Sequence, residues 1–384
     1  MKKFLLKTWS FLKKELMLAA SVLAAALALI ITPPDKSLLS GIDWRTLGTL
    51  LMMLLVLEGF KKENIFLPLM KIAGKCGNIR NLSIFLIFSV FFSSMFVTND
   101  VSLIIFVPLT ILLFRAEEKE KYILPVISME NIAAIRGSLL TPFGSPQNLY
   151  LYGQSGISAG SFILRMLPLC VFSAGLLLLF IFALYKNHGR DKLSAKEGAI
   201  ETAWAPERKK NRILYLGLFL LIVFVIVTRT AFWYIALIIV LITVFIADRS
   251  LYKKTDYVLL LTFLCFFVFS SSITENEAIS AFLMKNVTGH EYISSILLSQ
   301  VISNVPASIV LWPFTENLTA LLYGLDSAGL VSVIGSLASV INYRIYVREY
   351  PGKGLKFIGV FTLVSIIFFA LVVVPQYYLS MVNF

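Results

Sequence analysis

Apolar residues lie in long runs along this chain, and polar residues occupy the short intervals between them. A mostly apolar run of about 17–25 residues is typical of a helix that crosses a bilayer. The pattern therefore predicts an all-α membrane protein that crosses the bilayer many times. The runs lie at 15–34, 43–60, 81–97, 101–114, 123–150, 161–185, 212–228, 231–247, 256–272, 291–302, 305–314, 327–342 and 356–382.

Two pairs of runs do not fit simple crossings. A helix over residues 101–114 would reach only ~21 Å, short of the ~30 Å hydrocarbon core, and a single helix over 82–114 would reach ~50 Å. A hairpin that enters and leaves on one side removes both difficulties. We therefore expect re-entrant hairpins at 81–114 and 291–314, with tips at Thr98-Asn99-Asp100 and Ser303-Asn304. About nine spanning segments remain.

The run at 123–150 contains the sequence TPFGSPQN, from Thr141 to Asn148. Pro142 and Pro146 each lack an N–H group, and each ring clashes with the preceding turn of a helix. In hydrocarbon the freed carbonyls are tolerated only where the backbone is buried in protein or lines a wet cavity. The sequence therefore predicts a broken helix with a binding site near the membrane midplane. A proline kink satisfied by neighbouring helices is the alternative.

The two halves of the chain share one order of elements, which predicts inverted repeats at 1–185 and 212–384 around a charged cytoplasmic linker, 186–211. Inverted repeats with discontinuous helices are typical of secondary transporters whose site lies at the repeat interface. Each half has an Asp before a span, a short interfacial helix, a hairpin and a Gly-Ser pair: Asp43, 63–77, 81–114 and Gly144-Ser145, then Asp256, 274–287, 291–314 and Gly335-Ser336.

Charge sidedness supports this topology. The chain has 34 Lys+Arg and 22 Asp+Glu, a formal net charge of +12. With nine crossings and a cytoplasmic N-terminus, 28 basic residues face the cytoplasm, and only Lys36, Arg229 and Lys285 face outward. Such asymmetry is what the positive-inside rule describes. It predicts that the C-terminus lies outside, that hairpin 81–114 enters from the cytoplasm, and that hairpin 291–314 enters from outside.

Composition narrows the functional class. Hydrophobic residues make up 58% of the chain, and the mean hydropathy is +0.84. The three cysteines, Cys76, Cys170 and Cys265, lie far apart, which indicates neither a disulfide framework nor a metal site. The sequence shows no nucleotide fingerprint and no catalytic cluster. We expect neither an enzyme nor a nucleic-acid partner, and no cofactor other than sodium as a candidate ion.

The tip and break motifs resemble those of the ion transporter superfamily, which includes divalent-anion/sodium symporters, citrate carriers and arsenite permeases. The resemblance covers nearly the whole chain. The Asn-Asp tip is more similar to the arsenite-permease branch, whereas the dicarboxylate symporters carry Ser-Asn-Thr at both tips. The resemblance implies a homodimer in which the hairpin-bearing domain moves against a scaffold in an elevator-like way.

The tips and breaks offer chemistry for both an anion and a cation. The helix arms that begin at Val101 and Val305 present free N–H groups and a positive dipole end, which favour an anion. Opened backbone near the two glycines favours a cation such as sodium. The resemblance implies one cation site at Asn99 and Gly144 and another at Asn304 and Gly335. Our candidates are Thr98, Asn99, Arg136, Ser145, Asn148, Ser303 and Asn304 for the substrate, and Asn99, Asp100, Thr141, Gly144, Asn304, Gly335 and Ser336 for the cation.

Ionisable residues within the apolar runs leave two questions open. Asp100 either caps the second arm of its hairpin or carries a cation or proton. An unpaired arginine at the bilayer centre costs ~2.5–3.5 kcal/mol on insertion scales. Arg136 therefore either forms a structural pair with Asp100 or Glu130, or it recognises the charge of the substrate.

Together these features predict a secondary transporter of the inner membrane that moves a small anion, either a carboxylate or an inorganic oxyanion, coupled to sodium or protons. The alternatives are a sodium/proton antiporter that uses Asp100, and an arsenite-type efflux permease that works alone or with an ATPase.

Overall fold

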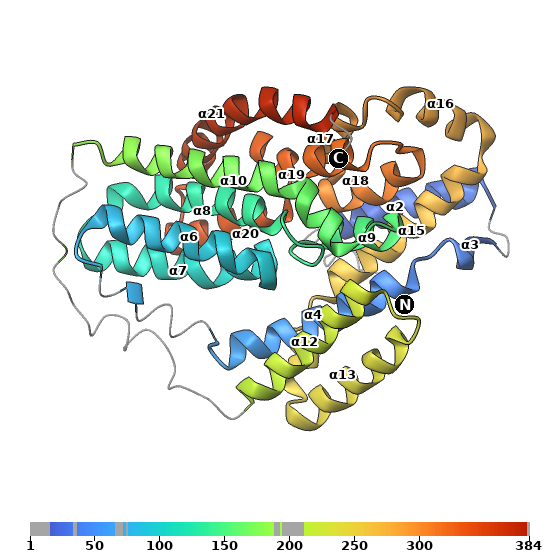
Figure 1. The fold of residues 1–384 in the computed structure, drawn as a ribbon, viewed down its shortest axis with the longest axis horizontal. Coiled ribbons are helices and arrows are strands. Elements are labelled where there is room, and N and C mark those ends of the chain that lie inside the picture. The colour runs from blue at the N-terminus through green and yellow to red at the C-terminus, as the bar shows by residue number, and fades with distance from the viewer. Residues whose placement is uncertain are drawn as a thin grey trace.

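Helices make up most of the part of the chain that the computed structural model describes (Figure 1). The structure describes residues 16–33, 37–65, 72–73, 76–187, 193 and 211–381. Five helices within these ranges are long and apolar enough to cross a membrane, and five more apolar helices are shorter. The protein is an all-α polytopic membrane protein, as the apolar runs predict.

The first half contains α2 (Leu16–Ile31), α3 (Ser37–Ser40), α4 (Trp44–Lys62), α6 (Ile79–Val97), α7 (Asn99–Ala116), η1 (Glu120–Tyr122), α8 (Ile123–Ser138), α9 (Pro146–Ser155) and α10 (Ala159–Leu184). The second half contains α12 (Arg212–Thr228), α13 (Trp233–Ala247), α14 (Ser250–Lys254), α15 (Tyr257–Glu275), α16 (Glu277–Val287), α17 (Glu291–Ile302), α18 (Asn304–Leu311), η2 (Trp312–Phe314), α19 (Leu318–Val331), α20 (Leu337–Glu349) and α21 (Gly354–Met381).

The helices pack in two groups (Figure 1). In one group α4 packs against α12, α13 and α15, and α15 also packs against α2. In the other group α8 packs against α6, α7, α10 and α21, while α19 packs against α17, α18 and α21. The two groups meet where α15 packs against α18. We call the first group the scaffold and the second the hairpin domain, because the second contains both hairpins.

The first helix of each repeat begins with the same cap. Asp43 has backbone angles φ −78° and ψ 82°, and its side chain accepts a hydrogen bond from the N–H of Thr46. Asp256 has φ −79° and ψ 83°, and its side chain accepts from the N–H of Leu259. An aspartate cap satisfies one of the N–H groups that a helix start leaves without a partner.

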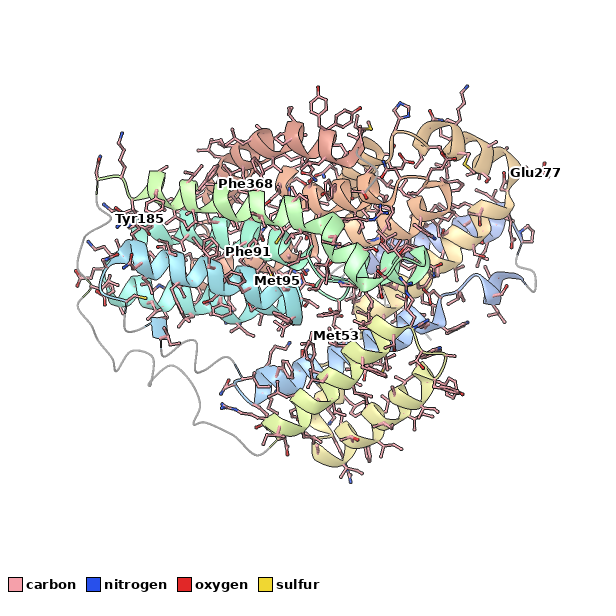
Figure 2. The ribbon with its side chains drawn as sticks, viewed as in Figure 1. Met53, Phe91, Met95, Tyr185, Glu277 and Phe368 are labelled. Atoms are coloured by element: carbon pink, nitrogen blue, oxygen red, sulfur yellow. The ribbon has the colours of Figure 1, made fainter. Side chains whose placement is uncertain are left out.

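Both hairpins turn at a single residue with the same left-handed backbone. Thr98 has φ 73° and ψ 155°, and Ser303 has φ 69° and ψ 161°. The chain folds back at Thr98, which brings α6 and α7 side by side. Ser93 on α6 accordingly donates a hydrogen bond to Ser102 on α7 over 3.0 Å. Phe91 and Met95, both labelled in Figure 2, lie on α6, and Met95 precedes Thr98 by three residues in the sequence.

The two breaks complete the correspondence between the halves. Ser145 (φ −147°, ψ 155°) begins α9, and Ser336 (φ −148°, ψ 139°) begins α20. Each of these helices packs against the second hairpin helix of the other repeat, α9 against α18 and α20 against α7. The two halves therefore have matching elements with reciprocal contacts.

The first hairpin is longer than the sequence predicts. Helix α7 has 18 residues and α6 has 19, which correspond to ~27 and ~28 Å. Both are long and apolar enough to cross a membrane, so the length argument for this hairpin was wrong. The apolar pattern missed the start of α7 because its first residues, Asn99 and Asp100, are polar. The one-residue turn at Thr98 defines the first hairpin.

The second half differs from expectation in where its broken helix starts. Helix α19 begins at Leu318, not at residue 327, and it ends before the break that leads to α20. The second hairpin is short, with 12 residues in α17 and 8 in α18. The interfacial segment predicted at 274–287 forms α16, whereas the one predicted at 63–77 lies mostly outside the described residues.

A glycine at each break allows the chain to approach the end of the preceding helix closely. A Cβ atom on Gly144 would lie 2.1 Å from the carbonyl oxygen of Ser138. A Cβ atom on Gly335 would lie 2.0 Å from the carbonyl oxygen of Ala328. Both distances are far below van der Waals contact, and the obstructing atoms belong to the backbone.

We predict that Gly144→Ala and Gly335→Ala each destabilise the protein, because the backbone must move to admit the methyl group. Overpacking of this kind costs about 1–3 kcal/mol or more. The thermal unfolding midpoint of the purified protein measures the effect. Gly217→Ala is the control, since it is exposed on α12 with no atom within 4 Å of its Cβ. Equal midpoints for all three variants would contradict the close-approach argument.

Candidate functional site

An asparagine begins the second helix of each hairpin. Asn99 is 4% exposed and Asn304 is 2% exposed, so both side chains are buried at the tips. The side-chain oxygen of Asn99 accepts a hydrogen bond from the N–H of Asp100 over 2.9 Å. The hydroxyl of Ser303 lies 3.4 Å from the side-chain oxygen of Asn304 and donates to it.

The tip residues before these asparagines have strained backbones. A φ near +70° with a ψ near 155–160° is a region that glycine tolerates, and another residue there costs about 1–3 kcal/mol. Thr98 and Ser303 both adopt it, and neither side chain caps the helix that follows. The helix starts at the tips therefore keep N–H groups that no capping side chain satisfies.

Side chains at the first break satisfy the carbonyls that the prolines and the glycine release. The amide nitrogen of Asn148 donates to the carbonyl oxygens of Ser138, Leu139 and Thr141 over 3.2, 3.3 and 3.4 Å. The hydroxyl of Thr141 donates to the carbonyl of Met95 over 2.5 Å, which ties the break to the end of α6. The break and the tip of the first hairpin therefore lie together.

Asn148 and Ser145 have structural partners in addition to their predicted role at the substrate. Ser145 caps α9 by accepting from the N–H of Asn148 over 3.3 Å. The side-chain oxygen of Asn148 is buried and has no hydrogen-bond partner among the described residues. Of the polar atoms of this side chain, the oxygen is the one free to contact a ligand.

The second break uses a glutamine that the sequence analysis missed. Gln300 accepts from the hydroxyl of Ser332 over 2.6 Å and donates to the carbonyl of Ala328 over 3.1 Å. Ser339 on α20 donates to the carbonyl of Gly329 over 3.3 Å. The signal was present, because Gln300 is a polar residue three positions before the tip at Ser303.

Asp100 lies in the first turn of α7 and does not cap it, because Thr98 occupies the N-cap position. One carboxylate oxygen of Asp100 is buried without a hydrogen-bond partner among the described residues. The charged groups that act on it are Asp256 and Lys61, which lie in the scaffold. The capping alternative is therefore not realised, and the carboxylate remains available.

Arg136 is fully buried on α8 and belongs to a network away from the tip asparagines. Its guanidinium donates to the hydroxyl of Ser327 over 3.0 Å and to the side-chain oxygen of Gln376 over 3.5 Å. The carboxylate that acts on it electrostatically is Asp326. Neither Asp100 nor Glu130, the partners proposed from the sequence, pairs with it.

Asp326 was missed because the sequence analysis started its segment at residue 327. Its side chain is 1% exposed, and one oxygen accepts from the side-chain nitrogen of Gln147 over 3.0 Å. This contact joins α19 to α9 across the two repeats. Extending the apolar run back to Leu318 would have placed Asp326 inside a helix of the hairpin domain.

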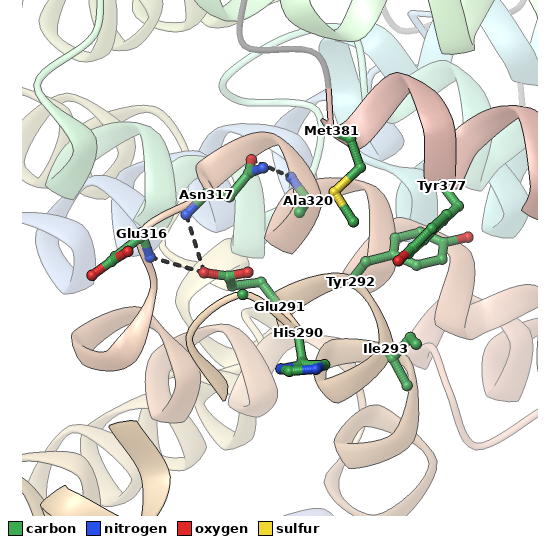
Figure 3. A pocket seen from close by; sticks show the side chains of 10 residues that line it. His290, Glu291, Tyr292, Ile293, Glu316, Asn317, Ala320, Tyr377 and Met381 are labelled. Carbon is green, nitrogen blue, oxygen red and sulfur yellow. Dashed lines mark hydrogen bonds between the residues drawn. The ribbon is translucent and has the colours of Figure 1, made fainter. Parts of the chain in front are cut away.

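A pocket of about 300 Å³ lies at the start of α17 and the end of α21 (Figure 3). The Glu291 carboxylate in its wall accepts from the N–H groups of Glu316 and Asn317 over 3.1 and 3.2 Å, just before α19, which is capped by Asn317. His290 and Tyr377 also line this pocket. None of the tip or break residues does, so the pocket is separate from the candidate site.

A helical membrane protein with two matched hairpins and two helix breaks has the architecture of a secondary transporter. The sequence comparisons agree. The family model for citrate transporters matches residues 7–335, and the chain belongs to this family.

Two relatives span most of the chain. The inner membrane protein YbiR of Escherichia coli is 32% identical over 318 residues, which is 80% of this chain and 82% of the relative. The uncharacterized transporter MJ0456 of Methanocaldococcus jannaschii is 31% identical over 309 residues, 79% of this chain and 81% of the relative. These matches identify the chain as a member of a family of multi-pass membrane transporters.

We predict that Arg136→Gln destabilises the protein and that Asp326→Asn restores stability. The arginine change leaves a buried carboxylate without its positive neighbour, and a buried group without its partner costs about 1–3 kcal/mol. Asp326→Asn removes the charge and retains an oxygen for Gln147. The measurement is the unfolding midpoint of the single and double variants.

Glu130→Gln, with all unfolding midpoints measured in sodium-free buffer, serves as the matched control, because Glu130 shares α8 with Arg136 but bonds to Thr110. Rescue by Glu130→Gln in place of Asp326→Asn would show that the sequence-based pairing was right after all.

Proposed function

We propose that this protein is a secondary active transporter that moves a small anion, a carboxylate or an inorganic oxyanion, across the inner membrane in exchange for or together with sodium or protons. The observation that supports this proposal most strongly is the similarity of the two hairpin tips. Thr98 and Ser303 share one strained conformation, and each precedes a buried asparagine at a helix start. Strain held at two equivalent places supports a binding role, because strained residues cluster at ligand sites.

Anion recognition would use the two helix starts. The N-terminal ends of α7 and α18 carry open N–H groups and the positive ends of the helix dipoles, which favour negative charge. The hydroxyls of Thr98 and Ser303 and the amides of Asn99 and Asn304 would complete the contacts. Asn148 would contact the substrate through its side-chain oxygen, with Ser145 beside it. Arg136 would support the site through its network with Ser327 and Gln376.

Cation coupling would use oxygen atoms at the tips and breaks, since hard cations prefer oxygen ligands. We propose one site at Asn99, Asp100, Thr141 and Gly144, and a second at Asn304, Gly335 and Ser336. The unpartnered carboxylate oxygen of Asp100 supports the first of these. Because Val305 stands at the equivalent position of the second tip, the two sites would differ in charge.

The same carboxylate supports the second candidate function, a sodium/proton antiporter with no organic substrate. An isolated carboxylate at a tip can alternate between a sodium ion and a proton. Sodium-dependent proton flux in liposomes without any added anion would select this function over anion transport.

We infer that the hairpin domain moves against the scaffold in an elevator-like way and that the scaffold forms a homodimer. The division of the helices into two packing groups supports the first inference. Exposed apolar side chains on the scaffold helices α12 and α13, such as Leu220, Phe224 and Ile246, offer a surface for lipid or for a second copy.

We predict that Asn99→Ala and Asn304→Ala each abolish transport while the unfolding midpoint changes little. Each variant removes a polar ligand at a helix start and leaves the packing of the hairpins in place. Uptake of a labelled anion by proteoliposomes, with a sodium or a proton gradient, measures the effect. Asn286→Ala, on the exposed surface of α16, is the control. Normal transport by both tip variants would place the binding site elsewhere.

We predict the following labelling pattern for single cysteines in a cysteine-free background. Gly160→Cys should react with a membrane-impermeant maleimide in intact cells, and Glu120→Cys should react only after permeabilisation. Phe96→Cys, next to the first tip, should remain unlabelled from outside if the hairpin re-enters from the cytoplasm. Rapid labelling of Phe96→Cys in intact cells would show that α6 and α7 both cross the membrane.

A further inference from the structure

Three buried oxygen atoms at the packing of α8 against α20 have no hydrogen-bond donor among the described residues. They belong to the side chains of Glu130, Asn131 and Asn342. All three residues are 0% exposed. Helix α7, which packs against both α8 and α20, contributes Thr110 to the same place, and its hydroxyl donates to the other carboxylate oxygen of Glu130 over 2.5 Å.

The contacts between the helices bring these residues together. The side-chain nitrogen of Asn342 donates to the carbonyl of Ile127 over 2.7 Å. The side-chain nitrogen of Asn131 donates to the hydroxyl of Ser339 over 3.0 Å. One turn of α8 therefore faces one turn of α20, and Glu130 lies within that turn of α8.

These contacts also fix the orientation of both amides. A backbone carbonyl only accepts hydrogen bonds, so the atom of Asn342 that meets Ile127 must be nitrogen. Ser339 donates its own hydrogen to the carbonyl of Gly329, so it accepts from Asn131 and the atom facing it is again nitrogen. The remaining amide atoms are oxygens, so the packing of α7, α8 and α20 holds three buried acceptors, on Glu130, Asn131 and Asn342, that have no donor among the described residues.

A cluster of acceptors buried away from water requires a donor or a positive charge, because unsatisfied buried polar groups are rare and costly. A proton on Glu130 would satisfy one of the two amide oxygens and leave the other without a partner. A monovalent cation bound between the three helices could serve all three oxygens, would balance the single negative charge, and could also take a lone pair of Thr110.

The repeat shows that the fold does not require polar residues here. Aligning the breaks, Ser145 with Ser336, pairs Asn131 with Leu322 and Asn342 with Leu151, and Glu130 with Leu321. These three leucines are fully buried. The same positions in the other half therefore form ordinary apolar core, and the polar cluster is an addition to one half only.

We propose that Glu130, Asn131, Asn342 and Thr110 bind a sodium ion at a site separate from the hairpin tips. Glu130 precedes the end of α8 by eight residues, which places the site ~12 Å along the helix from the first break. The ion would hold α7, α8 and α20 together, and so join the first hairpin to the broken helix of the other repeat. The proposal stands whether or not the tips bind an anion.

Equilibrium dialysis of the purified protein against radioactive sodium chloride, with no organic anion present, tests the proposal. We expect Glu130→Gln to bind one sodium ion per chain fewer than the unchanged protein. The glutamine can still accept from Thr110 and can donate to an asparagine oxygen, so this variant should remain folded in sodium-free buffer. Asn342→Leu, which copies the residue at position 151, should lose the same ion.

Asp100→Asn separates this site from the tip. The difference of one ion between proteins with and without Glu130→Gln should persist in the Asp100→Asn background, because the two sites are independent. Equal binding by the unchanged protein, Glu130→Gln and Asn342→Leu would overturn the proposal. So would a stabilising effect of acid, without any effect of sodium, that Glu130→Gln abolishes, since that result would identify a proton site.

Discussion

The backbone groups released where helices break inside the apolar interior set the strongest constraint on this structure. A carbonyl without a partner in that environment costs several kcal/mol. Each break is therefore closed by a side chain that belongs to another element. Asn148 and Thr141 do this in the first half, and Gln300 and Ser339 do it in the second. The hairpins and breaks are assembled as one unit because each supplies the partners of the other.

The same constraint explains why the two halves agree in backbone and differ in side chains. The angles of Thr98 and Ser303 match closely, since a one-residue reversal between helices leaves few conformations. The side chains that close the breaks need only donate a hydrogen bond to a released carbonyl. Ser339 therefore does in the second half what Asn148 does in the first. Backbone geometry is shared between the repeats, and the chemistry is free to diverge.

The all-α polytopic architecture could be predicted from the sequence, because apolar runs indicate membrane-crossing helices directly. The sidedness that the positive charges indicate stays a prediction. The hairpin tips, the break at Gly144 and the order of elements follow from such local signals. Partners across the fold do not. Arg136 meets Ser327 and Gln376, which lie far away in the chain, and no local pattern indicates that contact. Asp326 was missed because the predicted run started at residue 327, whereas the helix begins at Leu318.

Function in a repeat of this kind depends on where the two halves cease to match. Val305 occupies the position in the second tip that Asp100 occupies in the first, so only one tip carries a carboxylate. Glu130 aligns with Leu321, so only the first broken helix carries a carboxylate at this position. Both acidic residues lie in the first half, whereas Asp326 lies in the second, close to Arg136. The carboxylates of Asp100 and Glu130 therefore lie in the first half, and the Arg136–Asp326 neighbours lie at the contact between the halves. Our proposed cation sites depend on this difference in side chains between two halves that share one backbone arrangement.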